Sequence, residues 1–305
     1  MLQLTFTFIT SRLWTVGWWF FWVYMASCFS SFAQKVIVDS ADRQPIAYVS
    51  VICKNNVGTY ADENGRFKLA CSPSDTLFFS RIGYHSKFCV ARNLPDTIFL
   101  LSNNNLKEVV IKTRKTQNAG VELGYFDNKR GGHFTNVNQA ALFIENTTNQ
   151  EVKISKIGFQ VSNIKFSVSE KENRVSNSAI IVRPRIYGVA NDGTPDKDLL
   201  VKDLSKKIAK NQKKIEFDIS DLDLFLPESG VFLSLEFIGY YFNKNEINFK
   251  AFDEGSNNKE LLQFTPAFSK DHSTPKSWYK QGYGSTWKLI RREDSQINFN
   301  FGIKL

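Results

Sequence analysis

The sequence has few of the residues on which most metal and redox sites depend. Its 305 residues include three His, four Cys and two Met, and no Cys-x-x-Cys pair occurs. His85, His133 and His272 lie far apart, and none has a second ligand-type residue at the spacing that a zinc site needs. We therefore expect neither a metal site nor a cofactor.

Local signatures of hydrolytic enzymes are also missing. The sequence contains no Gly-x-Ser-x-Gly and no Cys–His signature of a nucleophilic enzyme. His85 precedes Ser-Lys-Phe and His133 precedes Phe-Thr-Asn, so neither has the neighbouring acid of a zinc peptidase. Glycosidase carboxylates lie far apart in a sequence, which leaves that class open here. We expect a non-catalytic protein.

Charge is absent from residues 13–29, which are apolar and aromatic. Arg12 precedes this run, and Ser31-Phe32-Ala33 follows it with small residues at the −3 and −1 positions of a cleavage site. This is the layout of a secretory signal peptide, and the run is shorter than the ~20 residues of a comfortable membrane span. We expect residues 1–33 to be removed, so that an exported chain begins at Gln34 in the periplasm, outer membrane or cell surface.

Two alternatives would keep the N-terminus at a membrane. One is an uncleaved apolar anchor, and the other is a lipid on Cys28, because Met25-Ala26-Ser27-Cys28 loosely resembles a lipoprotein signal. Membrane association is expected only through such an uncleaved or lipidated N-terminus.

Three cysteines remain after the expected signal peptide, namely Cys53, Cys71 and Cys89. Export permits one disulfide among them, but their odd number and spacing define no disulfide framework. Burial as small apolar residues is the other interpretation.

The net charge of +9 does not come from one concentrated basic segment, because acidic residues are interleaved along most of the sequence. Nucleic-acid binding requires a basic face, so we expect no nucleic-acid partner. The charge is typical of a solvated surface, with attraction to anionic glycans or lipopolysaccharide as a second interpretation.

An excess of 27 Phe over two Met favours sheets over helices. Within residues 47–53, small apolar residues occupy every second position, which is the period of a strand with one buried face. Asp62-Glu63-Asn64-Gly65 predicts a hairpin turn, because Asn-Gly accepts positive φ. About seven short strands in this region predict a small β-sandwich. The clearest strands are 36–38, 47–53, 67–69, 76–79, 98–101 and 109–111.

Four segments of this region carry a resemblance to a known family. They are PIAYVSV, TYADENGRFKL, LFFSRIGY and LKEVVI, within residues 34–112. This region resembles the carboxypeptidase-like regulatory domain, which is widespread in envelope proteins of Bacteroidetes, including the N-terminal extension of SusC-type transporters. The resemblance implies a transthyretin-like β-sandwich whose conserved residues are structural, with no catalytic residue.

Residues 113–130 are polar and charged and are expected to form a linker. Residues 131–305 again have the pattern of strands, and RPRIYGVANDGTPDKDLL with GVFLSLEFIG loosely resembles the jelly-roll modules that accompany such regulatory domains. We expect a larger, jelly-roll-like β-sandwich, which makes the whole chain all-β. The expected strands are 140–144, 152–161, 179–189, 214–219, 231–238, 261–264, 286–290 and 297–303.

Two segments of the second domain allow more than one interpretation. Residues 191–198 offer four oxygen-bearing side chains that could bind Ca²⁺, but Asp192-Gly193 predicts a hairpin turn, and Lys197 would repel a cation. Residues 198–211 are compatible with one helical turn, although their charges do not decide the matter.

The candidate binding residues are four aromatic residues near the C-terminus, Trp278, Tyr279, Tyr283 and Trp287. Aromatic faces of this kind stack on sugar rings in glycan-binding sandwiches. The competing interpretation is that Trp278 and Trp287 pair across a terminal hairpin and fill the edge of the core. Strand alternation favours this interpretation for Trp287, with Leu289 beside it, and leaves Trp278 as the more exposed of the two.

Together these observations predict a non-catalytic exported protein of the cell envelope that acts in binding, adhesion or assembly. Its partner is expected to be an envelope protein or a glycan. The alternative function is carbohydrate binding through the C-terminal aromatic residues.

Overall fold

A computed structural model describes the all-β fold of the chain from Lys35 to Leu305, with gaps. The expected signal peptide, Gln34, the strand at 109–111, most of the expected linker, His133, His272 and Tyr283 lie outside the described residues. The described ranges are 35–54, 57–68, 71–103, 120–125, 130–131, 138–148, 150–166, 179–209, 212–241, 247–248, 262–268, 276–282, 284–290 and 298–305.

Seven short strands form the first domain, in two sheets that enclose one apolar core. A three-stranded sheet has the order β4-β1-β7, and a four-stranded sheet has the order β3-β2-β5-β6. The expected small sandwich is therefore confirmed. The strands are β1 (Lys35–Asp39), β2 (Ser50–Ile52), β3 (Gly58–Tyr60), β4 (Arg66–Phe67), β5 (Thr76–Ser80), β6 (Lys87–Val90) and β7 (Thr97–Leu100).

The alternation expected in residues 47–53 is present, although the strand is shorter. Val49, Val51 and Cys53 are buried in the core, as the period of two predicts. Tyr48 interrupts the strand because its φ is 56°, a left-handed conformation that a strand does not contain. β2 therefore begins only at Ser50.

The turn expected at residues 62–65 is present, but it joins strands of different sheets. The carboxylate of Asp62 accepts hydrogen bonds from the backbone N–H groups of Asn64 and Arg66, and Gly65 has a φ of 70°. β3 before the turn belongs to the four-stranded sheet, whereas β4 after it pairs with β1. The turn is thus a crossover between the two sheets and not a simple hairpin.

Gly65 should be the glycine of this domain that tolerates a side chain least. A Cβ at this position would collide with the backbone oxygen of Ile37, whereas Gly193, at a similar φ of 79°, has open space around it. We expect Gly65→Ala to lower the free energy of unfolding by more than ~2 kcal/mol and Gly193→Ala by about 1 kcal/mol, since only the first adds a backbone clash to the strain of positive φ. Chemical denaturation of the two variants measures the difference, and equal losses would contradict it.

The described residues of the second domain form two large antiparallel sheets and one two-stranded sheet. The larger has the order β14-β13-β18-β10-β21-β22, with β15 paired to β13 and β19 to β18. The other has the order β8-β23-β12-β20-β9, with β16 paired to β12, and β11 pairs with β17. The strands are β8 (Glu122–Gly124), β9 (Arg130–Gly131), β10 (Gln139–Ile144), β11 (Val152–Lys153), β12 (Lys156–Phe166), β13 (Ala179–Val189), β14 (Pro195–Asp198), β15 (Lys206–Ala209), β16 (Lys214–Asp218), β17 (Phe225–Leu226), β18 (Val231–Tyr241), β19 (Ile247–Asn248), β20 (Leu262–Phe268), β21 (Ser277–Lys280), β22 (Lys288–Leu289) and β23 (Phe301–Lys304).

Eight strands of this domain alternate between the two sheets along the chain. β10, β13, β18 and β21 belong to the larger sheet, and β12, β16, β20 and β23 to the other. Their inward side chains form one apolar core, to which the first domain adds Ile82. This arrangement confirms the expected larger sandwich. Within the described ranges, no helix has the length and apolar character needed to cross a membrane.

Residues 191–194 form a turn between β13 and β14, as Asp192-Gly193 predicts. The Asp192 carboxylate accepts hydrogen bonds from the backbone N–H and the hydroxyl of Thr194, at 3.0 and 2.7 Å. Asp198, counted above as a potential Ca²⁺ ligand, instead forms an ion pair with Arg185. In residues 198–211 the helical alternative is wrong, because Lys206–Ala209 form β15 and pair with β13.

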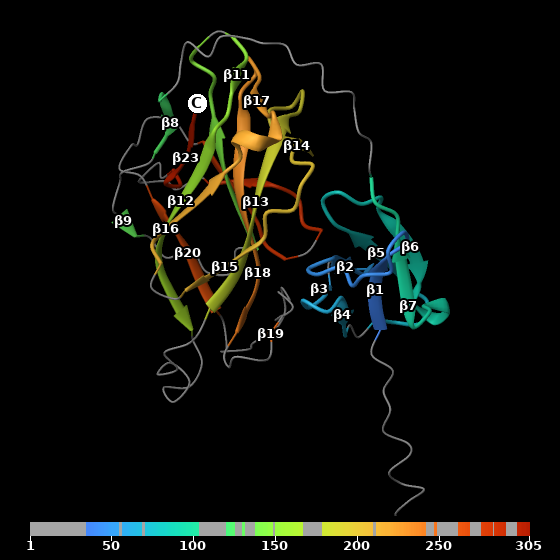
Figure 1. Cartoon of the computed structure of the whole chain (residues 1–305). Coiled ribbons are helices and arrows are strands. Elements are labelled where there is room, and N and C mark those ends of the chain that lie inside the picture. Colours follow the sequence, from blue (N-terminus) through green and yellow to red (C-terminus); the bar gives the residue numbers. More distant parts are fainter. Residues whose placement is uncertain are drawn as a thin grey trace, which may run out of the picture.

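The first domain lies beside the second on the side of the larger sheet (Figure 1). A small apolar cluster joins the domains, with Tyr60 from β3 against Ile181 of β13 and Ile238 of β18. Ile52 and Tyr48 pack at the edge of this cluster. The four-stranded sheet therefore turns its β2–β3 end towards the larger sheet.

Candidate functional site

The face of the larger sheet that points away from the core is unusually rich in charged and aromatic side chains. In β10, Ala140 and Leu142 point into the core, so Gln139, Ala141 and Phe143 lie on the outer face. The register of neighbouring strands continues this face across the sheet. One transverse row consists of Arg183, Glu236, Gln139 and Lys280.

Glu236 lies at the centre of this row and is buried. Its carboxylate accepts a hydrogen bond from Nε of Arg185 at 2.7 Å and lies 3.5 Å from Nη1 of Arg183. Arg183 is fully buried, and Arg185 also pairs with Asp198 at 2.9 Å. Buried charges of this kind are tolerated only when they are paired and hydrogen-bonded.

Asp203 extends the network to the first domain. Its carboxylate lies 3.0 Å from Nη2 of Arg183 and 3.0 Å from Nε of Arg81, which belongs to the first domain. Ser205 donates to the same carboxylate from its backbone N–H and its hydroxyl, at 2.8 and 2.5 Å. We call these residues the ion-pair cluster, defined as three cations and three carboxylates: Arg81, Arg183, Arg185, Asp198, Asp203 and Glu236.

Two further hydrogen bonds tie the domains together at the same place. Tyr60 of β3 donates its hydroxyl to Oε1 of Glu236 at 2.5 Å. Arg183 donates from Nη2 to the backbone oxygen of Tyr48 at 2.7 Å. The unusual backbone of Tyr48 thus presents an acceptor to a buried guanidinium. The ion-pair cluster therefore crosses the domain boundary.

Electrostatics of the cluster follow from the balance between burial and pairing. Burial by itself would raise the pKa of Asp203, but Arg183 and Arg81 hold that pKa well below its usual range. Burial also acts to raise the pKa of Glu236. The nearby Arg185 and Arg183 outweigh this effect, so the pKa of Glu236 is lowered. At Asp198 burial prevails and the pKa is raised, despite Arg185. Of the three carboxylates in the ion-pair cluster, Asp203 and Glu236 are therefore the two that stay ionised to low pH.

The aromatic candidates lie at the other end of the same face. Trp278 of β21 and Trp287, next to β22, are both half-buried, and neither belongs to the buried core. Trp278 packs edge-on against Phe232 at 6.1 Å between ring centroids, and Trp287 packs edge-on against Tyr187 at 5.6 Å. We call Tyr187, Trp278, Lys280 and Trp287 the aromatic edge.

The expectation that Trp287 fills the core is corrected by this register. Trp278 pairs with Leu289, not with Trp287, so the two Trp residues do not form a cross-strand pair. Trp287 does alternate with Leu289, but Leu289 lies opposite Trp278 on the outer face. The core of the sandwich is filled from this segment by Ile290 instead. Alternation placed the side chains on one face correctly but could not identify which face is buried.

Tyr279 and Lys280, which are neighbours in β21, lie on opposite faces of the larger sheet. Tyr279 points to the opposite side of β21 and packs against the core. Lys280 lies 4.6 Å from the ring centroid of Trp287, a cation–π contact. Burial lowers the pKa of Lys280, and repulsion by Arg185 lowers it further. The structure thus brings Trp278, Trp287 and a lysine together and separates Tyr279 from them.

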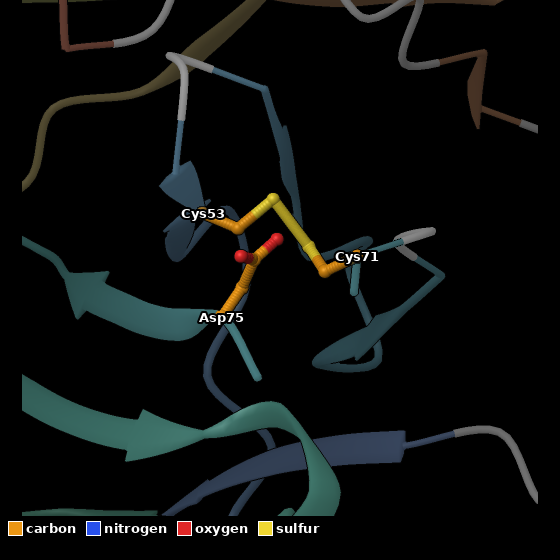
Figure 2. Close-up of side chains that lie close together, drawn as sticks. All are labelled: Cys53, Cys71 and Asp75. Carbon is orange, nitrogen blue, oxygen red and sulfur yellow. A yellow bond between two sulfur atoms is a disulfide. The ribbon is translucent and has the colours of Figure 1, made fainter. Parts of the chain in front are cut away.

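Cys53 and Cys71 form a disulfide in the first domain (Figure 2). Their Cα atoms are 6.6 Å apart, and Cys89 is the free cysteine of the described residues. The carboxylate of Asp75 lies beside the two sulfur atoms, all within 4.8 Å of one another. A cysteine binds a metal ion through its thiolate, and neither Cys53 nor Cys71 has a thiolate while the two are joined in the disulfide. The sulfur chemistry here is therefore structural cross-linking.

Comparison with known families agrees with this architecture. Residues 36–111 match the model of the CarboxypepD_reg-like domain, and this part of the chain is such a domain. Domains of this type are common in proteins associated with the envelope and outer membrane. No curated protein matches the chain. The disulfide and the domain together point to a protein outside the cytoplasm.

Sequence reasoning missed the ion-pair cluster, although two signals for it are visible. Arg183 and Arg185 stand two apart in an otherwise apolar strand, and Glu236 interrupts the apolar strand GVFLSLEFIG. Charges on one face of two such strands predict mutual pairing. Their pairing with Asp203 and Tyr60 depends on tertiary contacts that no local pattern contains.

The ion-pair cluster should make the protein sensitive to acid. A carboxylate whose pKa is lowered by folding adds stability that is full above its unfolded pKa of ~4 and is lost as the pH falls through the folded value. We expect the free energy of unfolding to decrease below about pH 5. Asp203→Asn should reduce this dependence and cost about 3–5 kcal/mol at pH 7, because it leaves Arg183 and Arg81 underpaired.

Urea denaturation from pH 7 to pH 3 measures both effects. The matched control is Asp221→Asn, which breaks the exposed pair of Lys202 and Asp221 and should change stability little. Equal losses in the two variants would show that the buried cluster does not stabilise the domain boundary.

Proposed function

We propose that this protein is a non-catalytic, exported component of the cell envelope, with the aromatic edge as its binding surface. The half-burial of Trp278 and Trp287 carries this proposal. A structural Trp is usually part of a core, whereas these two stand on the outer face of a sheet beside a lysine. Large aromatic side chains that keep an accessible part are typical of binding surfaces.

The ion-pair cluster supports a binding role over a catalytic one. Its three carboxylates are all engaged with arginines, so the cluster has the chemistry of a structural connection. The cluster fixes the first domain against the same sheet that bears the aromatic edge. A rigid platform of this kind lowers the conformational cost of binding.

Export should be visible at the N-terminus of the mature protein. Residues 1–33 have the layout of a signal peptide, and the disulfide and the regulatory-type domain suit an oxidising compartment. We expect mass spectrometry of the exported protein to give a chain that begins at Gln34. A lipid on Cys28 or an intact Met1 would contradict this cleavage, although the lipidated form would still be exported.

Removing the aromatic edge should abolish binding to the envelope without unfolding the protein. We expect Trp278→Ala and Trp287→Ala each to cost about 1–2 kcal/mol, less than the ~3–5 kcal/mol of a fully buried aromatic residue. Both variants should lose retention on isolated envelopes in a sedimentation assay. The matched control is Phe88→Ala, since Phe88 is 68% exposed on the first domain. Unchanged retention of the Trp variants would exclude the aromatic edge as the binding surface.

Carbohydrate binding is the second candidate, and one specific observation favours it. Trp278 and Trp287 are both half-buried on one sheet face, where aromatic residues can stack on sugar rings. Lys280 covers part of one ring, so a sugar would stack beside the ammonium group or displace it. A glycan array probed with the mature chain tests this function against a protein partner.

A further inference from the structure

Lys280 is a cation at the end of the ion-pair cluster, and it is not part of any ion pair among the described residues. The ion-pair cluster contains three arginines and three carboxylates, so its formal charges cancel. Lys280 adds a fourth cation to the same face, opposite Gln139 in the sheet register. Among the described residues, no carboxylate lies within ion-pair distance of its ammonium group, which lies over the ring of Trp287.

The surroundings of Lys280 make an anionic partner favourable. The side chain is half-buried, so its ammonium group has lost part of its hydration, and on the same face Arg185 repels it while Glu236 attracts it. Burial and the repulsion by Arg185 outweigh the attraction by Glu236 and disfavour the charged form in the free protein. An anion that reaches the ammonium group would offset both, and in partly desolvated surroundings the attraction is stronger than in bulk water.

We propose that Lys280, Trp278 and Trp287 bind the carboxylate-bearing sugar residues of an acidic polysaccharide. This inference rests on the proposed binding role of the aromatic edge and names its ligand class. The Trp rings supply apolar faces for pyranose rings, and the ammonium group donates to the carboxylate of a uronic acid. Lysine acts here as a point charge, which suits a carboxylate presented from a sugar ring at variable angle.

The side chains of the aromatic edge favour an acidic polysaccharide over other anions. A sheet face with two half-buried Trp residues beside one cation offers stacking along with charge, whereas a phosphate-rich partner requires several clustered cations. The arginines of the same face are already neutralised by carboxylates, which leaves one cation for one anionic group. One cation beside the ring of Trp287 matches a single carboxylate of a uronic acid.

Binding to three uronic-acid polymers, polygalacturonate, alginate and hyaluronan, tests the proposal. Each is compared with its methyl-esterified form, which keeps the rings and removes the charge. We expect the wild-type mature chain to bind at least one of the three about tenfold more tightly than its ester, with a difference that shrinks as salt is added. Lys280→Gln should abolish that difference, and Lys280→Arg should retain most of it.

The matched control is Lys288→Gln, which removes an exposed cation from the adjacent strand. Lys288 lies opposite Tyr279, so it is on the other face of the sheet from Trp278 and Lys280. This variant should bind as the wild type does. If Lys280→Gln reduced the thermal stability, the comparison of acid and ester forms in the wild type and in Lys280→Arg would still decide the question.

The outcomes separate this inference from the function on which it rests. Equal affinity for acid and ester forms, or an unchanged preference in Lys280→Gln, would overturn the acidic ligand and leave glycan binding intact. Lys280-dependent binding to phosphatidylglycerol vesicles with no binding to the uronic-acid polymers would overturn it in favour of a lipid surface. If the wild type bound no glycan on an array while envelope retention still required Trp287, the partner would be a protein.

Discussion

The buried carboxylate of Glu236 is the group on which the relation between the two domains depends. It accepts from Arg185 and from the Tyr60 hydroxyl of the other domain, and it lies beside Arg183. A buried charge requires such partners, so the position of the first domain is coupled to the ionisation of one side chain in β18. Pairing of this kind is a weak source of net stability compared with apolar contact, but it is specific about geometry. The apolar contact of Tyr60 with Ile181 and Ile238 supplies the attraction, and the ion pairs select one orientation.

The aromatic edge depends on the same strands. Gln139 lies between Glu236 and Lys280 in one transverse row, and it donates to the hydroxyl of Tyr187 at 2.7 Å and to Ser234 at 3.0 Å. Tyr187 in turn contacts Trp287. Gln139 therefore holds Tyr187 in place, and Tyr187 packs against the half-buried ring of Trp287. A surface organised in this way loses little conformational freedom when a ligand arrives.

The sequence predicts the strands well wherever one face is buried, because alternation follows from burial. Strands such as β10, β13 and β18 were expected almost to their ends. β15 and β21 were missed because each is short, and an edge or half-buried strand has no clear period. The aromatic candidates were found, but Trp287 was assigned to the core because alternation gives two faces without identifying which one is covered. Lys280 carried no sequence signal, since its isolation from carboxylates is a property of the folded sheet.

The contacts between the two domains give a physical reason why the first domain is attached to the second. The outer face of β13 and β18 carries Arg183, Glu236 and Ile238, and all three are buried. The two charged groups have therefore lost their hydration and require partners within the protein. The first domain covers this part through Tyr60, Tyr48 and Arg81, and its contacts neutralise or hydrogen-bond each charge there. At the β21 end of the same face, Lys280 has an aromatic contact but no carboxylate among the described residues. Charge left unpaired in an otherwise fully paired face has a physical cost, and a ligand that supplies the missing anion would remove that cost.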